Sequence, residues 1–120
     1  MASEALLDMT DQQVVALSRL FGLLADPTRV RIVLLLCRGE MNVSGLCQTL
    51  GQPQPTVSHH LGLLRRGGVL QTRRDGKAIH YALDQNLNYI DGCELSIDSA
   101  AGMRIRIGKQ PYLTPAVSAV

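Results

Sequence analysis

Two sets of side chains that could recognise another molecule lie within one stretch of this sequence. Ser58 and His59 are adjacent, and hydroxyl and imidazole groups can match the donors and acceptors on base-pair edges. Residues 51–83 also hold four arginines and one lysine against one aspartate, a local net charge of +4 in a chain whose net charge is +2. Such a concentration of positive charge indicates a polyanionic partner such as nucleic acid, and the alternative is a solvated basic face.

Composition narrows the class of protein. A chain of 120 residues has room for about one domain, and 46% hydrophobic against 18% charged residues predict a folded chain. One Phe, three Tyr and no Trp are too few rings for an RNA-binding surface of stacked aromatics. The longest apolar run, Ile32–Cys37, is far shorter than the ~20 residues of a membrane helix. Without a secretory signal or a membrane partner, we expect a cytoplasmic protein with reduced thiols.

Apolar residues at three- and four-residue spacing predict four helices. Asp26, followed by a proline, and Asn42 are typical N-caps, whereas Gly39 and Gly51 are typical residues at which a helix stops. The second helix is the most apolar, and we expect it to be the most buried through Val30, Ile32, Val33, Leu34, Leu35 and Leu36. The predicted helices span about 11–24, 27–38, 43–50 and 54–66.

The fourth predicted helix has two different faces. Its apolar residues share one side, at about 100° per residue, and would pack on the core. The opposite side is polar and basic and carries Ser58, His59, Gly62 and Arg66.

Two β-hairpins are predicted after the helices. In the first, strands 69–74 and 77–83 flank Asp75-Gly76, a strong signal for a two-residue turn, and Ile79, Tyr81 and Leu83 alternate inward. The second hairpin occupies residues 93–109 around a loop at Ala100-Ala101-Gly102. Its expected register pairs Ile97 with Ile105, Leu95 with Ile107 and Asp98 with Arg104.

This order of elements predicts an α+β fold, a winged helix-turn-helix with a second hairpin at its C-terminus. Residues 1–92 are assigned to the winged domain, and residues 93–109 to the hairpin, packed on the same domain or at a dimer interface. Residues 110–120 are expected to form a flexible tail. A helix of this kind fits the major groove of duplex DNA, and a basic hairpin beside it can reach phosphates or the minor groove.

Residues 14–83 resemble the ArsR/SmtB family of winged-helix repressors. The resemblance lies in LADPTRVRIVLLL at 24–36, QPTVSHHLGLLRRGGVL at 54–70 and RRDGKAIHYAL at 73–83. It implies a homodimeric repressor that binds palindromic double-stranded operator DNA and releases it when a small inducer binds. The expected DNA contacts are Gln54, Thr56, Ser58 and His59 for bases, with Arg65, Arg66, Arg73, Arg74 and Lys77 around them.

The resemblance does not identify the inducer. Arsenic-sensing members carry a Cys-x-Cys-x-x-Cys cluster, and the matching positions here are Asn42, Ser44 and Cys47, so two of the three thiolates are missing. The family's Asp and His site on a later helix has no counterpart, because residues 84–120 contain no histidine. Neighbouring His59 and His60 diverge by about 100° on a helix and do not suit one shared ion. His60 lies nearer the apolar side of the helix and is interpreted as a packing residue, whereas His59 faces outward. We therefore expect neither of these two metal sites to be intact and find no cofactor evident, which leaves a metal or thiol-reactive inducer as an open alternative.

Cys37 and Cys47 leave two interpretations open. Each could be a small buried hydrophobe. Alternatively, they could form a thiol sensor, in which a disulfide or a bound soft ion tilts the fourth helix.

The dimer interface and two rival functions also remain open. The first helix is apolar over more than half its circumference. We therefore expect this helix and the C-terminal hairpin to form the interface with a second subunit. A winged helix can instead serve as a protein-interaction module without DNA binding. A thiol enzyme would need a cysteine paired with a base, and the sequence has no such signature, so no enzymatic activity is predicted.

Overall fold

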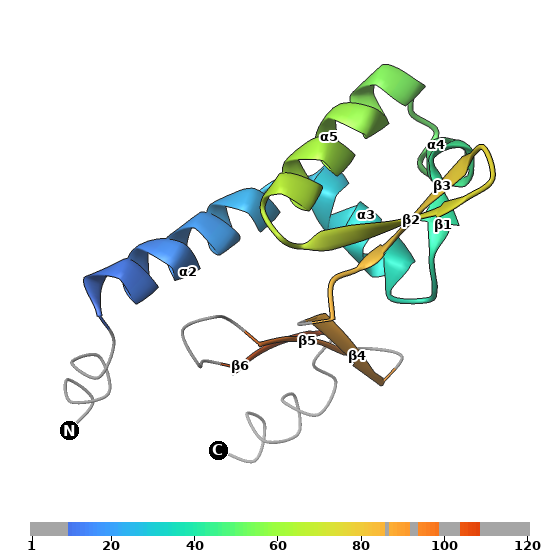
Figure 1. The fold of residues 1–120 in the computed structure, drawn as a ribbon. Coiled ribbons are helices and arrows are strands. Elements are labelled where there is room, and N and C mark those ends of the chain that lie inside the picture. Colours follow the sequence, from blue (N-terminus) through green and yellow to red (C-terminus); the bar gives the residue numbers. More distant parts are fainter. Residues whose placement is uncertain (1–9, 86, 92–93, 99–103, 109–120) are drawn as a thin grey trace, which may run out of the picture.

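The computed structural model describes residues 10–85, 87–91, 94–98 and 104–108, which form a small helical bundle and two antiparallel sheets (Figure 1). The helices are α2 (Asp11–Leu24), α3 (Pro27–Leu36), α4 (Val43–Leu50) and α5 (Gln54–Arg66). The strands are β1 (Met41–Asn42), β2 (Leu70–Asp75), β3 (Ala78–Leu83), β4 (Leu87–Asp91), β5 (Glu94–Asp98) and β6 (Arg104–Gly108).

Local capping explains where the helices begin and end. Asp26 accepts a hydrogen bond from the backbone N–H of Arg29 at the start of α3, and Asn42 accepts one from Gly45 at the start of α4. Gly51 ends α4 at φ 65°, a left-handed conformation that glycine adopts without strain. These predicted caps are confirmed, but α3 ends at Leu36 rather than at residue 38, because the next residues form a tight turn.

The core lies where α3, α4 and α5 meet the β1–β3–β2 sheet. Its fully buried side chains each contribute roughly 1.5–3 kcal/mol by leaving water; they are Ile32, Leu46, Val57, Leu61, Leu64 and Val69. The expectation that Val30 and Leu34 are buried too is wrong: their exposed fractions are 39% and 54%. α3 has the core on one side only, and its other side faces outward.

The β2–β3 hairpin differs in detail from its prediction. Asp75 pairs with Ala78, so the turn residues are Gly76-Lys77 rather than Asp75-Gly76. Gly76 has φ 62°, which suits glycine at the first position of a two-residue turn. Ile79 is 38% exposed rather than inward, because the hairpin extends past the core at that point. Strand β1, which was not predicted, pairs with β3 on its other edge.

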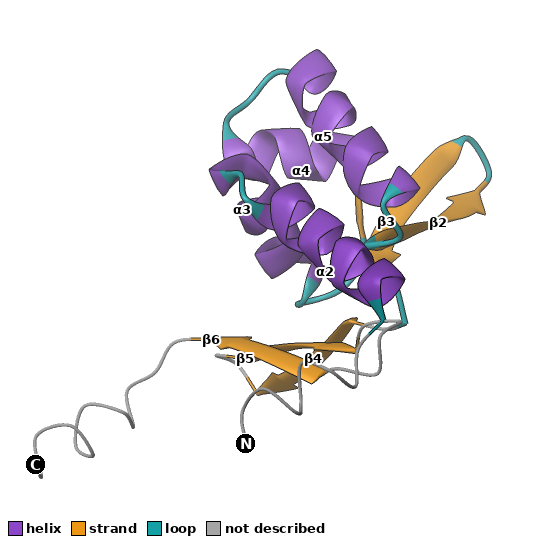
Figure 2. Ribbon diagram, turned by 90° about the vertical axis from the view of Figure 1, so that its left-hand side faces the viewer, coloured by secondary structure: helices purple, strands orange, loops and turns teal. Residues whose placement is uncertain are grey.

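The second sheet confirms the predicted pairing of β5 with β6, with Ile97 opposite Ile105, Leu95 opposite Ile107 and Asp98 opposite Arg104. An unpredicted strand, β4, pairs with β5 and makes this sheet three-stranded. Both ribbon views place the sheet across α3 from α5 (Figures 1 and 2). Cys93, the loop at 100–102 and the expected tail at 110–120 lie outside the described residues, and the division of the chain after residue 92 stays a prediction.

Among the described residues, no helix is both long and apolar enough to cross a membrane.

Candidate nucleic-acid interface

Helix α5 presents a polar face to the outside because its apolar face is entirely used by the core. Val57, Leu61 and Leu64 are each 0% exposed, which fixes the rotation of the helix about its axis. Ser58 and His59 are exposed on the other side, as the sequence predicted. The helix can therefore offer a hydroxyl and an imidazole to a partner without disturbing the core.

The first turn of α5 leaves few backbone donors unsatisfied, although no side chain caps it. The first four N–H groups of a helix have no partner within it. Here two of those four positions are Pro53 and Pro55, which have no N–H. Only the N–H groups of Gln54 and Thr56 remain, and both of these predicted contact residues have exposed side chains.

The last turn of α5 adds positive charge to the same surface. Arg65 and Arg66 lie there, where a cation also interacts favourably with the carbonyl end of the helix. A Cβ atom placed on Gly62 would lie 3.2 Å from Nη1 of Arg66. The Arg66 side chain therefore folds back along the outward face, over the glycine.

The hairpin β2–β3 forms the wing, and its two arginines point to opposite faces, because side chains alternate along a strand. Arg73 pairs with His80, and Arg74 with Ile79. Arg73 is engaged by Glu40: its Nε donates to Oε2 at 3.3 Å, and its Nη2 contacts Oε1. Arg74 has no such acidic neighbour among the described residues.

The Glu40–Arg73 pair affects both groups. The hydrogen bond from Arg73 lowers the pKa of Glu40 below its ordinary value, and the same bond raises the pKa of Arg73. Both side chains remain solvent-accessible, at 55% for Arg73 and 39% for Glu40, so the pair is screened by salt. Part of the wing's positive charge is thus compensated within the molecule.

The two elements that carry the predicted contact residues, α5 and the wing, lie next to each other (Figure 1). All of these residues are exposed; they are Gln54, Thr56, Ser58, His59, Arg65, Arg66, Arg73, Arg74 and Lys77. Their roles toward DNA stay predictions.

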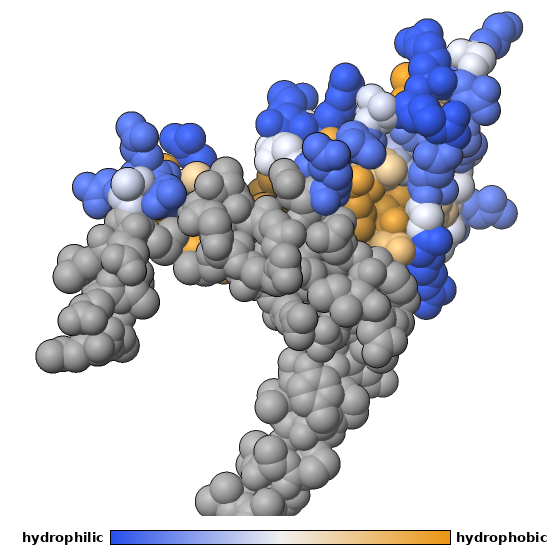
Figure 3. Space-filling view, turned by 60° about the horizontal axis from the view of Figure 1, so that its bottom comes forward, coloured by the Kyte–Doolittle hydropathy of each residue, from blue (hydrophilic) through white to orange (hydrophobic). Residues whose placement is uncertain are grey.

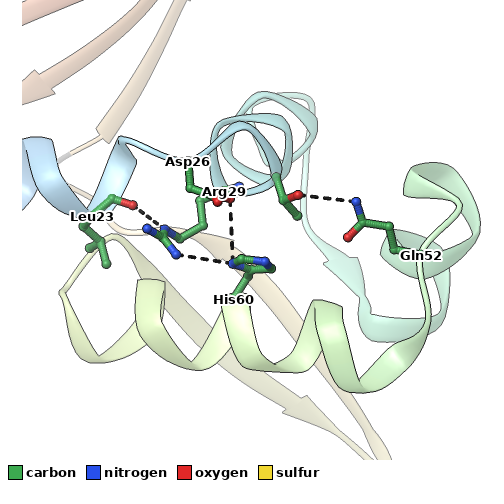
Figure 4. Close-up of polar contacts among 6 residues, drawn as sticks. Leu23, Asp26, Arg29, Gln52 and His60 are labelled. Atoms are coloured by element: carbon green, nitrogen blue, oxygen red, sulfur yellow. Dashed lines mark hydrogen bonds and ion pairs between the residues drawn. The ribbon is translucent and has the colours of Figure 1, made fainter.

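A polar cluster that sequence reasoning missed lies behind this surface, where α2, α3 and α5 meet (Figure 4). Arg29 donates from Nε to the carbonyl of Leu23 at 2.5 Å, and its Nη1 lies 3.4 Å from Nδ1 of His60. Asp26 approaches the same nitrogen at 3.9 Å. The side chain of His60 is only 15% exposed, which agrees with its interpretation as a packing residue.

A second polar contact ties the turn before α5 to the start of α3. Gln52 donates from Nε2 to the hydroxyl of Thr28 at 3.3 Å (Figure 4). The amide oxygen of Gln52 is buried and has no hydrogen-bond partner among the described residues. Two contacts thus connect α5 to the first turn of α3. Gln52 makes one just before the start of α5, and His60 makes the other at its middle.

Cys37 and Cys47 are free thiols, both partly buried and both packed against the core. Desolvation raises the pKa of the Cys37 thiol above its ordinary value, which lowers its thiolate fraction at neutral pH. This environment favours the structural interpretation of Cys37. Cys93 lies outside the described residues.

The position that matches the first cysteine of the arsenic cluster has a structural use here. The side-chain oxygen of Asn42 accepts a hydrogen bond from Gly45 at 2.8 Å and caps α4. No three His, Cys, Asp or Glu side chains in the described part of the chain are grouped so that they could hold a metal ion.

Figure 3 shows an apolar area beside the residues drawn in grey, on the face at the bottom of Figure 1. On α2, Val14, Val15 and Phe21 are each 48% exposed. A groove of about 300 Å³ between α3 and α4 has Leu34, Leu35 and Leu50 in its lining, with Arg31, Arg38 and Thr49. Leu20, Leu23 and Leu24 of α2 pack against the core, and its exposed apolar side chains are available to a partner.

The helices and the wing define a winged helix-turn-helix domain, and comparison with known proteins specifies its family. Residues 26–72 match the family described as bacterial regulatory protein, arsR family. The arsenical resistance operon repressor of Escherichia coli (strain K12) is 50% identical over 70 residues, which are 58% of this chain and 60% of that protein. The crystal structure of the transcriptional repressor BigR from Xylella fastidiosa matches with a TM-score of 0.58 and 37% identity, over 62% of this chain and 75% of that chain.

A third match is the homodimeric winged helix-turn-helix DNA-binding domain of a possible ArsR-family regulator from Mycobacterium bovis. Its TM-score is 0.56 at 28% identity, over 62% of this chain and 71% of that chain. This chain belongs to the ArsR family. It spans about three fifths of the length of the curated relatives that it matches first.

Proposed function

We propose that this protein is a transcriptional repressor that binds double-stranded operator DNA as a homodimer and acts in the cytoplasm. One observation carries the proposal: α5 buries its apolar face completely while it exposes Ser58 and His59 beside a basic wing. A helix with an adjacent cationic ribbon matches the shape of a major groove and its flanking phosphates. The names of the matched relatives support a regulatory role.

The inducer is proposed to be a thiol-reactive compound or a soft metal ion, with Cys37 and Cys47 as its targets. Cys37 follows the last residue of α3, and Cys47 lies on α4, so a change at either could shift the elements that support α5. Against this proposal, burial raises the pKa of Cys37.

A thiol titration of the native protein tests this inducer proposal. Accessible thiols, and a Cys37→Ser/Cys47→Ser variant that no longer releases DNA with arsenite, zinc, peroxide or polysulfide, would support it. Inaccessible thiols and unaltered release would contradict it.

DNA binding itself is tested by selection from a library of random duplexes, followed by titration of the enriched duplex and of a scrambled one at several salt concentrations. We expect one enriched sequence with two-fold symmetry. Its half-sites should lie about one helical turn, roughly 10 base pairs, apart. Binding should weaken steeply with salt. A protein without salt-dependent duplex binding would instead be an interaction module.

A further inference from the structure

We propose that Arg29 is a positioning residue for α5, and that it governs how well the protein distinguishes its operator from other duplexes. It does so from a half-buried position between the carbonyl of Leu23 and the ring of His60. The inference rests on the proposed function, since it assigns a further residue to the same DNA-binding surface.

The first contact of Arg29 completes the end of α2. The last carbonyls of a helix lack partners within it, and α2 has no basic residue in its last turn. Arg29 comes from the following helix and donates from Nε to the Leu23 carbonyl at 2.5 Å. Its positive charge also lies at the negative end of the helix dipole of α2.

The second contact reaches α5. Nη1 of the same guanidinium lies 3.4 Å from Nδ1 of His60. A guanidinium only donates hydrogen bonds, and its planar fork fixes the angle between its donors. A single rigid guanidinium therefore contacts both the end of α2 and the middle of α5 (Figure 4).

The backbone of Arg29 is also held in place. The backbone N–H of Arg29 donates to Oδ2 of Asp26 at 3.0 Å, within the first turn of α3. The same carboxylate lies 3.9 Å from His60. Arg29 therefore has little freedom to follow α5 if that helix rotates.

His60 is adjacent to His59, and this links Arg29 to the recognition of bases. His59 is exposed on the predicted base-reading face, and the two ring centroids are 5.6 Å apart. Base-reading groups must be held within about 0.5 Å and 10–20° of their productive geometry. Arg29 acts on them through His60.

The test compares Arg29→Met, which keeps the apolar stem but removes every donor, with Arg31→Met as a matched control. Arg31 is exposed on the same helix. Each variant is titrated with the duplex that the wild-type protein enriches from a random library and with a scrambled duplex, far below the melting temperature. For Arg29→Met we expect affinity for the enriched duplex to fall about tenfold, the effect of losing one hydrogen bond to a charged group, with unchanged scrambled binding and salt slope. Arg31→Met should leave the ratio of the two affinities unchanged.

A second pair of variants separates positioning from stability. His60→Leu should lower the same ratio, and the double variant Arg29→Met/His60→Leu should be no worse than the poorer single variant, because the two residues act through one contact. Arg29→Lys should recover part of the ratio of the affinities for the enriched and scrambled duplexes. One ammonium can replace the contact with either the Leu23 carbonyl or His60. If Arg29→Met does not fold, His60→Leu and Arg29→Lys decide the matter.

Equal weakening of both duplexes, with a smaller salt slope, would make Arg29 a phosphate contact and overturn the proposal. An unchanged ratio in Arg29→Met and His60→Leu would also overturn it, while leaving the proposed function intact. If the wild-type protein enriches no sequence at all, the proposed function fails, and this inference fails with it.

Discussion

At the scale of single residues, His59 and its neighbour His60 divide two tasks between them. His59 is exposed, whereas the side chain of His60 is only 15% exposed and contacts Arg29 and Asp26. The division follows from helix geometry, since adjacent residues diverge by about 100°. One imidazole is therefore exposed on the face proposed to read DNA, and the other packs against Arg29 and Asp26.

Replacing His59 with alanine should relax the sequence preference of the protein. We expect a loss of about 1–3 kcal/mol at the base pair that His59 contacts, with binding to unrelated duplex almost unchanged. Titration of the enriched duplex and of its single-base variants measures this. A loss of equal size on enriched and scrambled duplexes would contradict the base-reading role.

The two wing arginines should behave differently when each is changed to alanine. Arg74→Ala should weaken binding to all duplexes and reduce the salt slope by about 1, as for one lost phosphate contact. Arg73→Ala should have a smaller effect, because Glu40 already compensates the charge of Arg73. Binding measured as a function of salt distinguishes the two. Glu40→Gln is the matched control and should increase the salt slope by freeing Arg73; equal slopes for the two alanine variants would argue against this pairing.

At the scale of elements, the angle between α2 and α5 depends on a glycine just after α5. A Cβ atom on Gly67 would lie 2.2 Å from Cδ2 of Leu23, closer than non-bonded carbon atoms approach, so the Leu23 side chain would have to shift. Leu23 packs there against the core and also supplies the carbonyl that binds Arg29. The absence of a side chain at residue 67 therefore lets α2 approach α5.

Gly67→Ala should lower the free energy of unfolding by about 1 kcal/mol, the low end of the range for overpacking, because the contacting atom is the end of a flexible side chain that can shift. Urea denaturation followed by circular dichroism measures this. Gly22→Ala on α2 is the matched control, because nothing lies within 4 Å of its added carbon. Alanine in a helix is intrinsically better than glycine by about 0.5–1 kcal/mol, so this control should stabilise the protein. Destabilisation of equal size by both changes would show that packing on Leu23 is not the cause.

The start of α3 should make folding sensitive to acid. The hydrogen bond from the backbone of Arg29, assisted by the charges of His60 and Arg29, lowers the pKa of Asp26 below its ordinary 3.8 despite desolvation. A carboxylate with a depressed pKa stabilises the folded state above its unfolded pKa, and this contribution is lost as the pH falls through the folded value.

Asp26→Asn separates the cap from the charge, because an amide oxygen also caps a helix. Wild type should be more stable than this variant at neutral pH, and the difference should disappear as the pH falls below about 4. Unfolding free energies of both proteins across this range provide the measurement. A difference that stays constant with pH would mean that the charge of Asp26 contributes nothing.

At the scale of the whole molecule, the exposed apolar side of α2 should mediate the proposed homodimer. α2 exposes Phe21 with other apolar residues and buries no residue completely. α3 also exposes Leu34, but Arg31 and Arg38 border its groove, and a symmetric contact there would bring like charges together. α2 itself carries a single cation, Arg19.

Phe21→Glu should convert the dimer to a monomer and weaken binding to the two-fold symmetric duplex by about 100-fold or more, because the second half-site no longer adds avidity. Sedimentation at micromolar concentration and titration of the enriched duplex measure the two effects. Leu34→Glu serves as the control and should leave the dimer intact. A dimeric Phe21→Glu protein would place the interface elsewhere, the C-terminal sheet being the next candidate.

The sequence alone was sufficient for the features that depend on neighbouring residues. Capping residues and apolar spacing predicted the ends of α4 and α5, and alternation predicted the register of β5 with β6. The face of α5 that points outward followed from the same periodicity, because the opposite face had to be buried. Strand β1 escaped prediction, since two residues are too short to show a period.

Contacts between distant segments were decided only by the tertiary structure. Nothing in the spacing of Arg29 and His60, or of Glu40 and Arg73, shows that these side chains meet, because each pair is more than thirty residues apart. The exposure of Val30 likewise depends on whether another element covers α3. Local sequence determined which side chains α5 and the wing could offer to DNA. Packing between helices and strands decided which of them are free and which are held.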